Sequence, residues 1–274
     1  MKQLLIIDPQ NDFCDIPGAA LPVAGASADM VRLADFVRSN PLDGITVTLD
    51  SHATVAVERT TFWKTSSGEA PAPFTFVTEQ DVVSGRLLPR DASLTPRVVA
   101  MLRQLAARGR TGLVIWPVHC VTGTWGHNIF EGLAQSLAAW EDEQQSVVRK
   151  VFKGEYPLTE HFGVFEADAP DAAVQSTLFN SQLAQSLTQN VDLLFIGGEA
   201  SSHCVASSFD QLAGYLSRQG GRRPRLVLLR DCMSPVAGFE KAQEEFFLRA
   251  QAWGAEIMTS TQATEAYCQG AVCA

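Results

Sequence analysis

The chain has 274 residues, a formal net charge of −9 and a hydrophobic fraction of 46%. This length can bury a sizeable core, so we expect one domain over residues 1–274, with two domains as the alternative. Because an acidic protein is repelled by phosphate backbones, nucleic-acid binding is not expected. The N-terminus lacks a signal-peptide pattern and no apolar run is long enough to span a bilayer, which favours a cytoplasmic protein without a membrane partner.

Short runs rich in Val, Ile and Leu alternate with helical patterns along the chain. Such runs are typical of buried parallel strands, which we expect at 3–7, 44–49, 112–116, 192–196 and 225–229, with a weaker one at 146–152. Helices are expected at 27–38, 95–108, 205–218 and 238–253, with Ser27 and Thr95 as N-caps and Gly109 as a C-terminal stop. This alternation predicts a three-layer α/β/α fold with a mainly parallel central sheet.

Six cysteines are scattered through the chain without a C-x-x-C pair. In a chain with a large core most of them are expected to be buried small hydrophobic residues, not disulfide partners. Cys268 and Cys273, near the C-terminus, suggest no clear chemistry. Residues 65–73 and 219–224 are rich in loop-forming residues and are expected to be loops.

Reactive side chains follow most of the expected strands. Because ligands bind outside the carboxyl ends of strands in a parallel sheet, these side chains are expected to share one crevice. They are Asp8, Asp50, His52, His119, Lys153, His203 and Cys204.

Cys204 lies between an expected strand and an expected helix, where the helix N-terminus favours a thiolate and free N–H groups can hold an oxyanion. A buried structural thiol is the alternative. Asp8 could accept the thiol proton as a general base, or could cap the turn that follows it. Lys153 could lower the pKa of the thiol, although it could also be a solvated surface lysine, and Lys150 competes for the role.

Asp50 and His52 form an Asp-x-His pair at a strand end, where residues two apart point the same way. With His119 they offer one carboxylate and two imidazoles, a set that suits zinc, iron or manganese. Without His119, a turn-capping Asp and a surface His are the simpler interpretation. His127 and His161 are expected at the surface or at the edge of the core.

Four segments together resemble the nicotinamidases, within the isochorismatase-like cysteine hydrolases. They are residues 5–14 (LIIDPQNDFC), 48–52 (TLDSH), 116–123 (WPVHCVTG) and 197–205 (GGEASSHCV), and residues 153–156 (KGEY) fit the lysine segment of that family. The resemblance extends from about residue 3 to residue 260. It implies an isochorismatase-like α/β fold in which Asp8, Lys153 and Cys204 form the catalytic triad, and it favours Lys153 over Lys150.

The resemblance also implies the surroundings of the triad. The oxyanion hole would be the N–H groups of Ala200 and Cys204, beside a cis peptide bond between Glu199 and Ala200. The metal, zinc or else iron or manganese, would be held by Asp50, His52 and His119 and would bind the pyridine nitrogen of the substrate. The residues expected to bind the substrate are Phe13, Trp116, Glu199 and His203.

Three segments depart from the family pattern. No further histidine follows the Asp-x-His pair, so a water or Glu58 could complete the metal site. The stretch 63–110 is enlarged and could reshape the mouth of the pocket, and residues 157–162 lack the usual tyrosine. The function expected is hydrolysis of nicotinamide to nicotinate and ammonia. The alternatives are a related amidase acting on another small primary amide or ureide, or a non-catalytic metal- or ligand-binding protein, and a homo-oligomer is possible.

Overall fold

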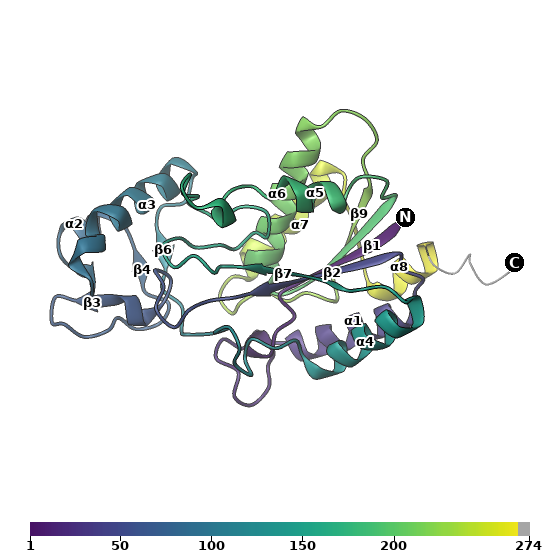
Figure 1. The fold of residues 1–274 in the computed structure, drawn as a ribbon, viewed down its shortest axis with the longest axis horizontal. Coiled ribbons are helices and arrows are strands. Elements are labelled where there is room, and N and C mark those ends of the chain that lie inside the picture. Colours follow the sequence, from purple (N-terminus) through teal and green to yellow (C-terminus); the bar gives the residue numbers. More distant parts are fainter. Residues whose placement is uncertain (268–274) are drawn as a thin grey trace, which may run out of the picture.

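A six-stranded parallel sheet forms the centre of the computed structural model, which describes residues 1–267 (Figure 1). The strand order is β10-β9-β8-β1-β2-β7, and every pair of neighbours is parallel. Four of the five strong apolar runs and the weaker run are strands of this sheet, as expected. Its strands are β1 (Lys2–Ile7), β2 (Gly44–Asp50), β7 (Arg149–Lys153), β8 (Leu193–Gly198), β9 (Arg225–Leu229) and β10 (Glu256–Met258).

Helices cover both faces of this sheet, which confirms the three-layer α/β/α fold (Figure 1). Each face has its own hydrophobic cluster, because the side chains of each buried strand alternate between the two sides. One face packs against α1 (Ala26–Ser39), α4 (Glu131–Gln144) and α8 (Ser260–Tyr267). The other packs against α5 (Ser181–Ser186), α6 (Ala206–Arg218) and α7 (Glu240–Trp253).

The apolar run 112–116 does not join the central sheet, which corrects the expectation from its sequence. Its central part is β6 (Leu113–Val114), which pairs with β4 (Phe76–Val77) in a separate antiparallel ribbon. The run is hydrophobic because Leu113 and Ile115 are buried in a third cluster. Apolar character indicates burial but does not identify the sheet that a strand joins.

The enlarged stretch 63–110 is folded and lies at one end of the sheet (Figure 1). Its residues supply most of the third hydrophobic cluster, so it has packing of its own. Strands β3 and β5 pair in an antiparallel ribbon. The elements of this stretch are β3 (Trp63–Thr65), β4, α2 (Glu79–Val83), β5 (Leu87–Pro89) and α3 (Thr95–Ala107).

The helix starts differ from the expected caps by one or two residues. Ser27 lies inside α1, and the Asp15 carboxylate outside the helix accepts hydrogen bonds from the N–H groups of Gly25 and Ser27. Thr95 is the first residue of α3 and not its cap. Gly109 has a φ of +83° just after α3, as expected for a helix stop.

Cys14, Cys120, Cys204 and Cys232 are free thiols and all are buried, as expected for most of the cysteines. Cys268 and Cys273 lie outside the described residues. None of the helices in the described part of the chain has the length and apolar character needed to cross a membrane.

Candidate active site and metal centre

Four adjacent strands, β8, β1, β2 and β7, end at one edge of the sheet and bring their reactive residues together. Asp8 follows β1, Asp50 ends β2, Lys153 ends β7, and Cys204 lies shortly after β8. All four side chains are buried. Lys150, the competing lysine, is 44% exposed and points away from this group to Glu141. The expected crevice at the carboxyl ends of the strands is therefore present.

The Lys153 ammonium is the common contact of this group. Its Nζ lies 2.9 Å from Asp8 Oδ2, 2.8 Å from Asp50 Oδ1 and 3.6 Å from Cys204 Sγ. It also donates a hydrogen bond to the backbone carbonyl of His161 at 3.1 Å. A single buried cation therefore contacts the sulfur and two carboxylates.

Burial and charge set the protonation states of these side chains. Burial disfavours the charge on Lys153, but the carboxylates of Asp50 and Asp8 outweigh it and raise the pKa of the lysine well above its usual value. Burial raises the pKa of Asp8, and the charge on Lys153 partly opposes this. Burial also raises the pKa of Cys204 well above normal, although Lys153 lowers it as expected. Cys204 is therefore a neutral thiol at rest, and a nearby base must remove its proton.

Two polar side chains hold these residues from behind, one at the carboxylate of Asp8 and the other at the backbone of Asp50. Thr48 donates a hydrogen bond to Asp8 Oδ1 at 2.6 Å and accepts one from the Asp8 backbone N–H at 3.0 Å. The amide of Gln10 accepts from the Asp50 N–H at 2.7 Å and donates to the Asp50 carbonyl at 2.8 Å. The carboxylate of Asp8 and the backbone of Asp50 are thus both held in place.

Cys204 lies in a π-helical turn, residues 201–205, that leads directly into α6. The peptide bond between Glu199 and Ala200 is cis, as the family resemblance implied. Outside the helical turn itself, no backbone carbonyl in the described part of the chain accepts from the N–H groups of Ala200 or Cys204. These two N–H groups are the candidate donors for an oxyanion.

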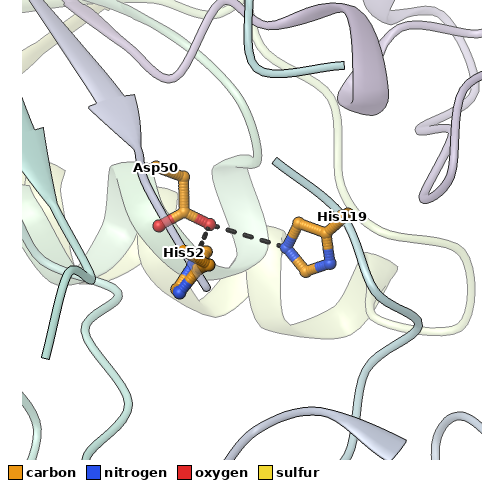
Figure 2. Close-up of side chains that lie close together, drawn as sticks. All are labelled: Asp50, His52 and His119. Carbon is orange, nitrogen blue, oxygen red and sulfur yellow. Dashed lines mark ion pairs between the residues drawn. The ribbon is translucent and has the colours of Figure 1, made fainter. Parts of the chain in front are cut away.

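Asp50, His52 and His119 offer three ligand atoms that lie within 4.8 Å of one another (Figure 2). Asp50 Oδ2 lies 2.8 Å from His52 Nε2 and 3.5 Å from His119 Nε2. Burial and the nearby charge of Arg59 lower the pKa of His119 to about 4, so this imidazole is neutral. One carboxylate with two imidazoles is a donor set found in catalytic zinc sites.

The far nitrogens of both imidazoles are also held. Glu58 Oε1 lies 2.9 Å from His52 Nδ1, and the Pro117 carbonyl lies 2.9 Å from His119 Nδ1. Carboxylate and carbonyl partners behind the ring are typical of metal-binding histidines, because they orient the other nitrogen. Glu58 therefore supports His52 from behind and does not join the three converging atoms. The residues present fit a divalent cation.

A small cavity opens onto the sulfur and the candidate metal ligands. Its walls include Phe13, Trp116 and His203, three of the four residues expected to bind the substrate. Phe162 also lines it, and its ring packs 5.1 Å from that of His203. Glu199 is not brought together with them, because its carboxylate turns away from the cavity toward the Ser234 N–H.

The motifs did not single out several residues that shape this site. Glu160 lines the cavity and accepts a hydrogen bond from Trp116 Nε1 at 3.0 Å, and burial and neighbouring acids raise its pKa to about 8. His161, expected at the surface or at the edge of the core, is buried beside Lys153. His127 is also buried, against Ser51. Their segments offered no strand-end or spacing pattern that could have marked them.

No family model matches the chain, and no curated protein does. Solved structures do match it. The yeast nicotinamidase aligns with a TM-score of 0.63 at 18% identity, over 94% of this chain and 99% of the yeast protein. A nicotinamidase/pyrazinamidase from Acinetobacter gives 0.63 at 16% identity, over 95% and 97% of the two chains. The Pyrococcus horikoshii pyrazinamidase, solved with zinc, gives 0.51 at 17% identity, over 94% and 98%. The chain therefore has the α/β fold that nicotinamidases share with isochorismatase-like hydrolases.

Proposed function

We propose that the protein is a cysteine amidohydrolase that converts nicotinamide to nicotinate and ammonia. The observation that carries the proposal is the contact of one buried ammonium, that of Lys153, with Asp8, Asp50 and the sulfur of Cys204. A structural thiol has no need of a buried acid and a buried amine. This grouping has the parts of an activated nucleophile, namely a thiol, a base and a cation that stabilises negative charge.

Asp8 takes the proton of the Cys204 thiol as the sulfur attacks the amide carbon. The N–H groups of Ala200 and Cys204 stabilise the resulting oxyanion. Asp8 then gives its proton to the leaving nitrogen, the C–N bond breaks, and ammonia departs from a thioester. A water molecule loses a proton to Asp8, attacks the thioester and releases the carboxylic acid, and the proton returns to the sulfur. The charge on Lys153 stabilises whichever of the two groups, Asp8 or Cys204, is negative.

The cavity and the candidate metal centre support an aromatic amide as substrate. Phe13, Trp116 and Phe162 give the cavity aromatic walls, which suit a flat aromatic ring. Asp50, His52 and His119 would hold the divalent cation, with zinc preferred by the ligand set. That cation would act as a Lewis acid that orients a ring nitrogen of the substrate.

A related amidase acting on a different primary amide or ureide is the second candidate. A wider cleft adjoins the cavity and shares Glu160, Phe162 and His203 with it. The enlarged stretch 63–110 supplies part of the wall of this cleft, including Leu105. An amide with a larger substituent could extend from the cavity into this cleft.

Ammonia release from nicotinamide by the zinc-loaded protein tests the proposal, with a panel of other primary amides and ureides measured in parallel. The Cys204→Ala variant is expected to lose turnover and to keep its zinc content. Cys232→Ala is the matched control, because Cys232 is also a buried free thiol but does not line the cavity. This control should remain active.

The outcomes separate the candidates. Faster turnover of another amide than of nicotinamide would select the second candidate. Zinc binding without ammonia release from any compound would select a non-catalytic binding protein. Turnover retained by Cys204→Ala would exclude the mechanism itself.

A further inference from the structure

Glu199 directly precedes Ala200 but has no contact with the cavity. Its side chain is fully buried, and its backbone N–H donates to the Ile7 carbonyl at the end of β1, at 2.8 Å. Its carboxylate Oε2 accepts a hydrogen bond from the Ser234 N–H at 3.2 Å. Glu199 is therefore tied on one side to the central sheet and on the other to the loop after β9.

Ser234 connects both sides of Ala200 to helix α1. While its N–H binds Glu199, its carbonyl accepts a hydrogen bond from the Ser201 N–H at 2.9 Å. Its hydroxyl donates to Asp29 Oδ2 at 2.6 Å. The residues before and after Ala200 are therefore fixed to one serine, and Asp29 fixes that serine.

Asp29 and Glu199 are both buried, and both carboxyl groups accept hydrogen bonds from Ser234, which brings the two groups close together. Glu199 Oε1 is buried and meets no N–H or O–H donor among residues 1–267. Two carboxyl groups can form a hydrogen bond only if one of them carries a proton. Burial, and then the charge of Asp29, raise the pKa of Glu199 well above its usual value, which places the proton on this pair.

The charged and titratable groups around Asp29 and Glu199 also favour a proton on this pair. Arg32 forms an ion pair with Asp29 on its other side. The loop after β1 places the acid Asp15 and the thiol of Cys14 near Glu199, and neither adds a positive charge. The groups that face the pair are Asp29 and Arg32 on α1, with Cys14 and Asp15 on that loop.

We propose that Glu199, through a proton shared with Asp29, is a positioning residue that holds the Ala200 N–H in the oxyanion hole. Its effect on turnover rests on the proposed amidohydrolase function, whereas its effect on the backbone does not. Family resemblance suggested a substrate contact for Glu199, but the geometry assigns it this supporting role.

Two variants test the proposal. Glu199→Gln keeps the shape, and its amide can donate to Asp29 and accept from the Ser234 N–H. Glu199→Ala removes both interactions. Glu199→Ala is expected to lower kcat for nicotinamide by about 10²-fold with little change in KM, because oxyanion stabilisation acts in the transition state. Glu199→Gln should stay close to the wild type.

Hydrogen exchange measures the backbone without any substrate. In Glu199→Ala the segment 199–206 should exchange faster than in the wild type, and in Glu199→Gln it should not. The infrared difference spectrum of wild type minus Glu199→Gln should contain a band of a protonated carboxyl group. Glu69→Gln, at an exposed glutamate, is the control and should leave that band unchanged.

The pH dependence of Tm gives a further readout. Because the pKa of Glu199 is raised in the folded state, the stability of the wild type falls as pH rises above the ordinary pKa of a glutamate. Glu199→Gln has no such carboxyl group and should not lose stability in this way. The difference in Tm between Glu199→Gln and the wild type should therefore grow with pH. Unchanged exchange in Glu199→Ala would overturn the positioning role, and a Glu199→Gln variant as impaired as Glu199→Ala would overturn the shared proton. If the wild type hydrolyses no amide, the proposed function fails, while exchange and infrared spectra still decide this inference.

Discussion

Replacement of Lys153 by methionine removes the one cation that Asp8 and Asp50 share. Methionine is also long and unbranched, so the change keeps most of the packing and deletes the ammonium. Lys153 is 2% exposed and Asp8 is fully buried. Solvent therefore cannot replace the lost contacts, which include those at 2.9 Å and 2.8 Å.

The expected loss of stability is large. Breaking a buried ion pair by removing one partner costs about 3–5 kcal/mol, because a buried charge is left unpaired. For a chain of this size that loss corresponds to a fall in Tm of roughly 5 to 10 °C. The loss should be smaller at low pH. Without Lys153 the pKa of Asp8, which burial already raises, rises further in the folded variant. The folded variant then keeps a proton on Asp8 at a pH where the unfolded chain has released it, so its stability falls as pH increases.

Urea unfolding at pH 5.5 and pH 8 measures both effects. The free energy of unfolding of the variant should be lower than that of the wild type at both pH values, and the difference should be larger at pH 8. Lys150→Met is the matched control. That lysine lies three residues earlier, is 44% exposed, and its Nζ is 3.7 Å from Glu141, so its loss should change stability by about 0.5 kcal/mol or less. A Lys153→Met variant within about 1 kcal/mol of the wild type at pH 8 would refute the reasoning.

Three further changes test the supports of the site. Thr48→Val removes the hydroxyl that donates to the Asp8 carboxylate and should lower kcat about tenfold or more. Because that hydrogen bond lowers the pKa of Asp8, its loss should also shift the acid limb of the pH–rate profile to higher pH. Glu58→Gln should weaken zinc binding about 10- to 100-fold, measured by competition with a chelator. Gly154→Ala would place a Cβ 2.6 Å from the His52 ring and should also weaken zinc binding, unlike Gly238→Ala, which has the same φ of +85° and open space. Equal zinc affinities in the two alanine variants would contradict the Gly154 contact.

The sequence predicts the central sheet well, because buried parallel strands are continuous apolar runs. The expected strands 3–7 and 192–196 correspond to β1 and β8, whose bounds differ from the expected ones by one or two residues. The same pattern locates the crevice, since parallel strands must present their carboxyl ends at one edge. Asp8, Lys153 and Cys204 meet there even though they are far apart in the sequence.

The sequence cannot give what depends on tertiary partners. The run 112–116 has the composition of a central strand, yet β6 pairs with β4 because the enlarged stretch folds against it. Glu160 was not identified as a site residue, because a lone acid in a loop is ordinarily solvated. Only the packing of its loop reveals that it is buried against Trp116 and the cavity.

Asp50 joins two parts of the site that sequence motifs treat as separate. Its Oδ1 contacts the Lys153 ammonium at 2.8 Å, and its Oδ2 contacts the imidazoles of His52 and His119. A cation held by these three ligands would draw charge from the same carboxylate that stabilises Lys153. The pKa of the nucleophile and the affinity of the metal centre are therefore linked through one side chain. Changes at Lys153 and at His52 share this partner, so their effects on turnover should not add.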